Sequence, residues 1–113
     1  MLTIYHNNRC SKSRNGLEFL EKSGKEFKIV NYLEDTLTFD ELKDIISLLD
    51  IKPIDLVRKN EALWKSDYKG KILSNNETIQ AMVDNPKLIE RPIVVNGKTA
   101  VVGRPLENIL KII

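Results

Sequence analysis

Apolar and polar positions along the chain predict strands near its two ends and a helical middle. Residues 2–5 form a short apolar run that predicts a first strand, and residues 27–33, rich in aromatic and branched side chains, predict a second. A helix is expected between them, from about Ser11 to Lys22, with Gly24 as its stop. A strand, a helix and a strand of these lengths favour a right-handed parallel crossover.

The middle of the chain has only helical patterns. Thr38 and Glu41 form a capping-box signature before an amphipathic helix. The weakly patterned residues 64–74 predict a loop or a short helix, and Asn75 or Asn76 is expected to cap a further helix. The apolar positions expected inside these two main helices are Leu42, Ile45, Ile46, Leu49, Ile79, Met82 and Val83.

The end of the chain carries a hairpin signal. Ile93–Val95 and Thr99–Val102 predict two strands joined by Asn96-Gly97, and a last helix is expected to start at Pro105. The order is therefore β-α-β, a helical block, and β-β-α. It predicts an α/β fold that resembles the thioredoxin and glutaredoxin plan. That plan is a four-stranded mixed sheet flanked by helices, here with a helical insertion between the β-α-β and β-β-α halves.

Composition and charge narrow the class of protein. The 113 residues fit a single domain, residues 1–113, and 42% hydrophobic with 30% charged residues is typical of a globular protein. No apolar run approaches the ~18 residues that span a membrane, and the N-terminus lacks a secretory pattern, so a cytoplasmic protein without a membrane partner is expected. A net charge of +2 is too weak to indicate nucleic acid. The patterned faces fit one core, so a monomer is expected.

Cys10 is the candidate for chemistry. It is the only cysteine, and it stands where the polar loop after the first strand becomes a helix. A lone cysteine is often a small buried hydrophobe, but the neighbours of Cys10 are all polar. The helix N-terminus and the cations Arg9, Lys12 and Arg14 favour the thiolate, and such settings bring a thiol pKa from ~8.5 towards ~3.5–7.5.

The surroundings of Cys10 limit its reactions. Cys10-Ser11-Lys12-Ser13 is a CxxS sequence, so an outside thiol must resolve any oxidised form of Cys10. Ser13 and the loop amides are candidate hydrogen-bond partners of the thiolate, although Ser11 or Ser13 can equally be a plain N-cap. His6, the only histidine, is either a base or thiol modulator or a structural residue. No His, Cys or carboxylate cluster has metal-ligand spacing, so no metal and no bound cofactor are expected.

Three arginines have distinctive positions. Arg91 directly precedes Pro92, Arg104 directly precedes Pro105, and Arg58 lies in the run Leu56-Val57-Arg58-Lys59-Asn60-Glu61. Taken singly, each fits a solvated surface residue. Together with a thiolate they would form an oxyanion clamp, because guanidinium groups match tetrahedral oxyanions.

With these residues the chain resembles the glutaredoxin-linked arsenate reductases of the thioredoxin fold over nearly its whole length. The resemblance implies reduction of arsenate to arsenite, with glutathione as co-substrate and glutaredoxin as protein partner. The chain departs from the family's well-studied members at Ser11-Lys12, where they carry Gly-Thr. The pieces that carry the resemblance are Tyr5-His6-Asn7, Cys10, Ser13-Arg14-Asn15, Tyr32-Leu33-Glu34, Leu56-Val57-Arg58-Lys59-Asn60, Glu90-Arg91-Pro92-Ile93-Val94-Val95 and Arg104-Pro105.

The same resemblance implies a role for each site residue. It makes Cys10 the catalytic thiol and His6 its modulator. It makes Pro92 a cis-proline next to the active site, although cis is a minority state for X-Pro bonds. The oxyanion ligands that it implies are Arg58, Arg91 and Arg104.

Two alternatives come from other functional classes. One is a thiol-based transcriptional regulator of the same fold that binds RNA polymerase. Such relatives typically carry CxxC and lack the Arg104-Pro105 pair, so Ser13 and Arg104 argue against it. The other is a glutathione-dependent oxidoreductase without arsenate activity, which would act on mixed disulfides when arsenate is absent.

Overall fold

The computed structural model describes residues 2–113, and the chain divides into two compact units. One unit contains the chain up to Asp35 together with Arg91–Ile113, and the other contains Thr36–Glu90. The first unit therefore combines the predicted β-α-β and β-β-α halves, and the second is the helical insertion. The assignment of the whole chain to one domain stays a prediction.

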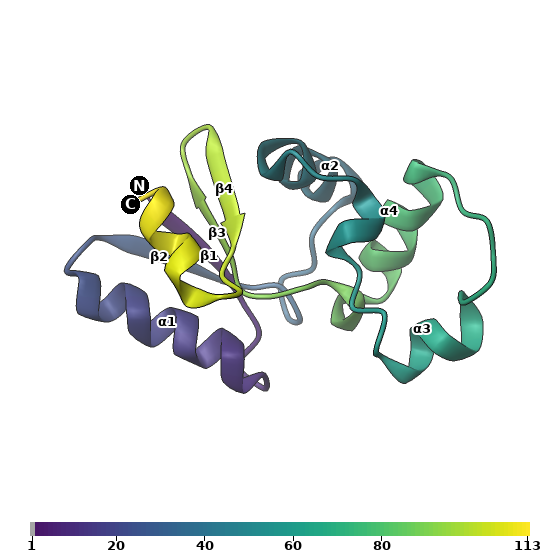
Figure 1. Cartoon of the computed structure of the whole chain (residues 1–113), viewed down its shortest axis with the longest axis horizontal. Coiled ribbons are helices and arrows are strands. Elements are labelled where there is room, and N and C mark those ends of the chain that lie inside the picture. Colours follow the sequence, from purple (N-terminus) through teal and green to yellow (C-terminus); the bar gives the residue numbers. More distant parts are fainter. Residues whose placement is uncertain (1) are drawn as a thin grey trace. The chain divides into compact units, whose positions relative to one another are not determined.

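The first unit is built on a four-stranded sheet (Figure 1). Its strands are β1 (Leu2–His6), β2 (Phe27–Asn31), β3 (Ile93–Asn96) and β4 (Thr99–Val102), in the spatial order β2-β1-β3-β4. β1 pairs with β2 in parallel and with β3 antiparallel, and β3 pairs antiparallel with β4. The prediction of a mixed α/β sheet flanked by helices is confirmed.

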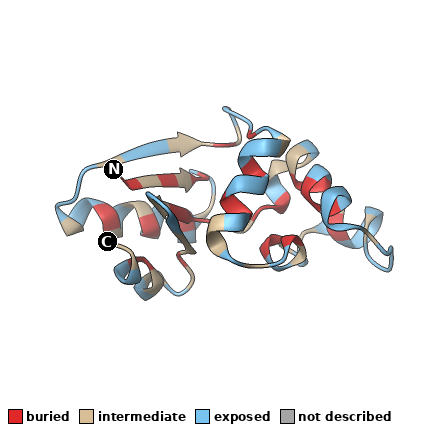
Figure 2. Ribbon diagram, turned by 90° about the horizontal axis from the view of Figure 1, so that it is seen from above, coloured by how far each residue is buried: buried red, intermediate tan, exposed pale blue. Residues whose placement is uncertain are grey.

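One face of this sheet packs against two helices, α1 (Ser11–Ser23) and the 3-10 helix η3 (Leu106–Lys111). Leu20 of α1 and Ile109 of η3 join a core that contains Leu2, Ile4 and Val94 of the sheet. Burying an aliphatic side chain completely contributes ~1.5–3 kcal/mol. Figure 2 shows the resulting alternation of buried positions along β1, which ends at the buried His6. The core therefore fixes the place where β1 ends and α1 begins.

Pro92 is held between two glycines in the same unit. A Cβ atom on Gly16 would lie 2.5 Å from Cγ of Pro92, and one on Gly103 would lie 3.0 Å from it. The main-chain N–H of Gly103 also donates to the oxygen of Pro92 at 2.8 Å. The absence of side chains at both glycines therefore lets α1 and the segment between β4 and η3 approach the segment that follows Arg91.

The second unit is helical. Its elements are α2 (Phe39–Leu49), α3 (Ala62–Asp67), α4 (Asn75–Asp84) and the 3-10 helices η1 (Pro53–Leu56) and η2 (Pro86–Leu88). The predicted capping box is confirmed, because Thr38 Oγ1 accepts from the N–H of Glu41 while Glu41 Oε1 accepts from the N–H of Thr38. Val57 and Ile89 form an isolated antiparallel bridge.

Several element ends and the type of the last helix differ from the sequence predictions. Ser74, rather than Asn75 or Asn76, caps α4, because it forms a second capping box with Glu77. The second strand ends at Asn31, whose main-chain oxygen accepts from the N–H groups of Glu34 and Asp35 and so begins a turn. The last helix is 3-10 rather than α-helical. No helix within residues 2–113 is long and apolar enough to cross a membrane.

Candidate active site

The loop after β1 places Cys10 at the N-terminus of α1. The N–H of Cys10 donates to the oxygen of Asn7 at 3.0 Å, and the N–H of Arg9 donates to Oδ1 of Asn7 at 2.9 Å. Cys10 is itself the N-cap residue, with extended backbone angles, and its oxygen accepts from the N–H of Arg14 at 3.0 Å. Because the cap residue carries a thiol, the first N–H groups of the helix point towards sulfur.

Ser13 joins the end of β1 to the first turn of α1. Its Oγ accepts from the N–H of Asn7 at 2.9 Å and lies 2.8 Å from Nδ1 of His6. All three residues are buried. The hydroxyl of Ser13 therefore holds the loop, while its main-chain N–H acts on the thiol of Cys10.

His6 lies behind the loop and contacts the hydroxyl of Ser13. Burial lowers the pKa of His6 below its ordinary value, a hydrogen bond to the main chain of Ser13 opposes this shift, and the positive charge of Arg14 adds to it. The imidazole is therefore neutral at pH 7. In the tautomer that leaves Nδ1 unprotonated, the hydroxyl of Ser13 donates to His6 while accepting from Asn7.

The thiol of Cys10 is only partly buried, and its environment favours the thiolate. Burial raises the pKa of this thiol, but hydrogen bonds from the N–H of Ser13, the side chain of Arg91 and the N–H of Lys12 outweigh burial, and the charge of Arg91 adds to them. The net effect lowers the pKa of Cys10 below its ordinary value. A larger share of Cys10 is therefore nucleophilic at neutral pH than of a free cysteine.

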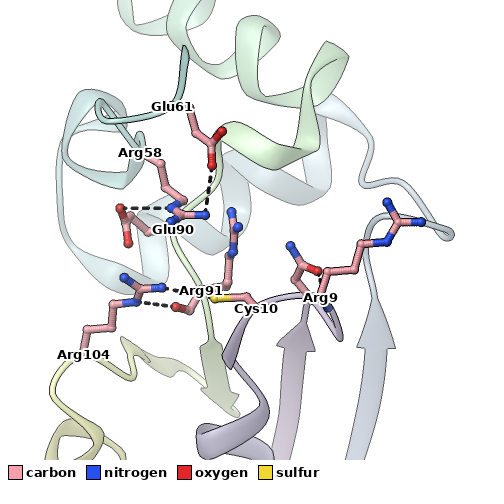
Figure 3. Close-up of polar contacts among 8 residues, drawn as sticks. Arg9, Cys10, Arg58, Glu61, Glu90, Arg91 and Arg104 are labelled. Atoms are coloured by element: carbon pink, nitrogen blue, oxygen red, sulfur yellow. Dashed lines mark hydrogen bonds and ion pairs between the residues drawn. The ribbon is translucent and has the colours of Figure 1, made fainter. Parts of the chain in front are cut away.

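Arg104 connects Cys10 with Arg91 (Figure 3). Its Nη2 lies 3.5 Å from Sγ of Cys10, and its Nε donates to the main-chain oxygen of Arg91 at 2.7 Å. The Arg91–Pro92 and Arg104–Pro105 peptide bonds are both cis. Arg104 and Arg91, two of the three arginines singled out from the sequence, therefore both act on the thiol of Cys10. The side chain of Arg9, by contrast, is exposed and points away from Cys10 (Figure 3).

Arg58 lies in the helical unit, where carboxylates hold its side chain. Its Nη1 lies 3.1 Å from Oε1 of Glu61, and its Nε lies 3.9 Å from Oε1 of Glu90. The main-chain N–H of Arg58 donates to the oxygen of Leu88 at 2.7 Å. The sequence reasoning did not include these acidic partners, although the spacing of Glu61 three residues after Arg58 is a usual sign of an ion pair.

Comparison with known proteins decides the family. Residues 5–112 match the ArsC family. The chain belongs to the ArsC family. It is 46% identical over 112 residues to "Uncharacterized protein YfgD" of Escherichia coli, covering 97% of this chain and 94% of that protein. It is 41% identical over 110 residues to "Arsenate reductase" of Neisseria meningitidis, covering 96% and 94%.

A solved structure supports the same assignment. The arsenate reductase from Vibrio cholerae matches this ArsC-family chain with a TM-score of 0.93 and 40% identity, covering 99% of this chain and 97% of its own. The thioredoxin-like fold expected from the order of elements is therefore confirmed.

A hollow of about 370 Å³ lies in the sheet-containing unit of this ArsC-family chain, and Arg104, which contacts the thiol, forms part of its wall. Sequence reasoning missed it, because its walls come from two segments that are far apart in the chain. Only the i, i+3 spacing of Lys12 and Asn15 on one helix face hints that these two side chains share a surface. The lining residues are Lys12, Asn15, Gly103, Arg104, Pro105 and Leu106.

The groups gathered around Cys10 suit an anionic reactant better than a metal ion. Within residues 2–113, no group of three or more His, Cys, Asp or Glu side chains could hold a metal. The arginine groups and the helix N-terminus all favour negative charge next to sulfur. This arrangement can stabilise a thiolate and neutralise an oxyanion that the thiolate attacks.

Proposed function

We propose that this protein reduces arsenate to arsenite through the thiolate of Cys10, with glutathione and glutaredoxin as reductants. The observation that carries the proposal is the 3.5 Å contact between Nη2 of Arg104 and Sγ of Cys10. Relatives named arsenate reductase, at 41% and 40% identity, support an oxidoreductase of this kind.

The first step is attack on arsenic. The guanidinium groups of Arg91 and Arg104 bind the arsenate oxygens and offset the charge that builds up as sulfur approaches. An S–As bond forms, an As–O bond breaks, and the oxygen leaves as water after it gains a proton. The product is a Cys10 thioester of arsenate in which arsenic is still in the +5 state.

Reduction occurs in the second step. The thiolate of glutathione attacks Sγ of Cys10, an S–S bond forms, and the S–As bond breaks with its electron pair going to arsenic. Arsenite leaves with arsenic in the +3 state, and Cys10 remains joined to glutathione. Since the chain has no second cysteine, an outside thiol must release Cys10. A glutaredoxin thiolate takes up the glutathione, and a second glutathione frees the glutaredoxin.

Several residues act through their neighbours. Ser13 and His6 hold the loop that carries Cys10, and His6 acts on the thiol only through Ser13. Arg58 completes the proposed oxyanion ligands on the strength of the family resemblance alone. We place the reaction in the cytoplasm, where glutathione keeps thiols reduced, and assign it to a monomer.

A coupled assay tests the proposal. Purified protein with arsenate, glutathione, glutaredoxin, glutathione reductase and NADPH should consume NADPH in proportion to arsenate. Cys10→Ser should abolish consumption, whereas Arg9→Ala, which changes an exposed residue directed away from Cys10, should retain it. Consumption at the level of the blank contradicts arsenate reduction.

Two further outcomes separate the alternative functions. Turnover of a mixed disulfide such as the glutathione adduct of hydroxyethanethiol, with no arsenate requirement, would identify a glutathione-dependent oxidoreductase. Specific capture by the RNA polymerase α subunit, without turnover of arsenate, would identify a transcriptional regulator.

A further inference from the structure

The hollow that Arg104 lines lies in the sheet-containing unit. It lies between the first turns of α1, which supply Lys12 and Asn15, and the segment that leads from β4 into η3. Its volume of about 370 Å³ is larger than a tetrahedral oxyanion requires. It falls at the lower end of the ~300–1,000 Å³ that is typical of small-molecule sites.

The lining of the hollow has a clear chemical character. Lys12 and Arg104 are cationic, Asn15 can donate and accept hydrogen bonds, and none of the six lining residues is acidic. Pro105 and Leu106 supply apolar surface on the side of η3. A ligand that combines carboxylate and amide groups with an aliphatic part fits such a wall, because each kind of group finds its counterpart.

Arg104 connects this hollow with the reacting sulfur. The same side chain lines the hollow and places Nη2 3.5 Å from Sγ of Cys10. Its Nε is fixed on the main-chain oxygen of Arg91, so the guanidinium keeps its orientation. A ligand bound in the hollow can therefore contact both Lys12 and Arg104, the residue whose guanidinium touches the thiol.

We propose that this hollow binds the anionic thiol co-substrate, glutathione, and that Lys12 determines the preference for thiols that carry a carboxylate. The inference rests on the proposed function, because it assigns a site to the reductant of that reaction. The ammonium group of Lys12 attracts a carboxylate of the tripeptide, while the sulfur of the tripeptide faces Cys10. Lys12 is exposed, so this attraction is screened by solvent and modest in size.

A reaction without arsenate tests the site. In thiol–disulfide exchange, the Cys10 thiolate attacks one sulfur of oxidised glutathione. A Cys10–glutathione disulfide forms, and the other half leaves as reduced glutathione with the electron pair of the broken bond. The same exchange occurs with bis(2-hydroxyethyl) disulfide, which is neutral, and with cystamine, which is cationic. Mass spectrometry of the intact protein measures the rate with each disulfide.

The measured quantity is the ratio of the rates with oxidised glutathione and with the neutral disulfide. Any effect of a substitution on the pKa of Cys10 cancels in this ratio. We expect Lys12→Ala to lower it about two- to fivefold, the size expected for one exposed charge pair. Lys12→Glu should lower the glutathione ratio further. The same substitution should raise the ratio of the rate with cystamine to the rate with the neutral disulfide.

Lys22→Ala is the matched control, because it removes an exposed lysine from the other end of the same helix. Its ratio should equal that of the wild type. The inference is overturned if the ratio is the same for the wild type, Lys12→Ala and Lys12→Glu. It is equally overturned if Lys22→Ala lowers the ratio as much as Lys12→Ala, since net charge would then be the cause.

The two proposals fail in distinguishable ways. If Lys12→Ala lowers the ratio as expected but arsenate is not reduced, the substrate assignment fails and the thiol site stands. If arsenate is reduced but the ratio does not respond to Lys12, the site assignment fails and the proposed function stands.

Discussion

Nη2 of Arg104 lies 3.5 Å from Sγ of Cys10, although 94 positions separate the two residues in the sequence. The strand order places β1, which leads to Cys10, beside β3, which pairs with the strand that leads to Arg104. The contact therefore depends on the sheet topology. It combines a nucleophile and a fixed guanidinium in one place.

The planar guanidinium of Arg104 is expected to contribute more to arsenate binding than its positive charge alone would. Arg104→Lys keeps the charge but cannot contact both the oxygen of Arg91 and the sulfur of Cys10 in the same way. Losing one charge-assisted hydrogen bond should weaken arsenate binding roughly tenfold or more. Titration calorimetry with arsenate measures the change. Arg9→Lys serves as the control, and equal affinities for Arg104→Lys and the wild type would refute the role of the guanidinium.

Protein stability should depend on the ionisation of Cys10. Its folded-state pKa is lowered, so the thiolate contributes stability that is fully present above the unfolded-state value of ~8.5 and is lost as pH falls through the folded-state pKa. The difference in unfolding free energy between the wild type and Cys10→Ser should therefore shrink from alkaline to acidic pH. Urea denaturation across this range measures it. A difference that stays constant with pH would show that folding leaves the pKa of Cys10 unchanged.

The hydroxyl of Ser13 is expected to contribute to the stability of the folded protein. Ser13→Ala removes the hydroxyl that accepts from the buried N–H of Asn7 and contacts the buried His6, so the unfolding free energy should fall by about 1–3 kcal/mol. Ser11 is exposed at the start of the same helix, and Ser11→Ala should change stability by less than about 0.5 kcal/mol. Equal urea midpoints for the two variants would contradict the role assigned to the hydroxyl.

Gly16 is expected to tolerate no side chain. A Cβ atom would lie 2.5 Å from Cγ of Pro92, so Gly16→Ala forces α1 or the proline segment to move. Overpacking of this kind costs ~1–3 kcal/mol, which exceeds the ~1 kcal/mol that alanine gains over glycine inside a helix. Thermal unfolding should show a net loss of stability. Glu21→Ala, on the exposed surface of α1, is the control, and a stabilised Gly16→Ala variant would contradict the packing described.

The sequence predicts those features that depend on local signals. The hairpin around Gly97, the box formed by Thr38 and Glu41, and the stop at Gly24 each depend on a few neighbouring residues, and the structure confirms them. The joining pair is shifted by one residue, because β3 extends to Asn96 and pairs it with Thr99, so that Gly97 and Lys98 connect the strands. The cap of α4 was misassigned because Asn75 and Asn76 are good caps by type, whereas Ser74 alone has a glutamate three residues later.

The less predictable part of the site depends on tertiary packing. Ser13 and the loop amides were expected to hydrogen-bond the thiolate, and the N–H of Ser13 does act on Cys10, whereas the binding of its hydroxyl to the end of β1 was not foreseen. The hollow joins Asn15 with Leu106, and no periodic pattern relates residues so far apart in the chain. Local patterns identify side chains of the right type, and the topology decides which atoms meet.

The alkylation of Cys10 as a function of pH, with and without arsenate, is the most direct test of the proposed role of Cys10. The account predicts a pKa below the ordinary ~8.5 of a cysteine and slower alkylation when arsenate is added, because the oxyanion occupies the space next to sulfur. Arg9→Ala should behave like the wild type, since the side chain of Arg9 points away from Cys10. A pKa near ~8.5 that neither arsenate nor sulfate changes would identify an ordinary thiol and contradict the account.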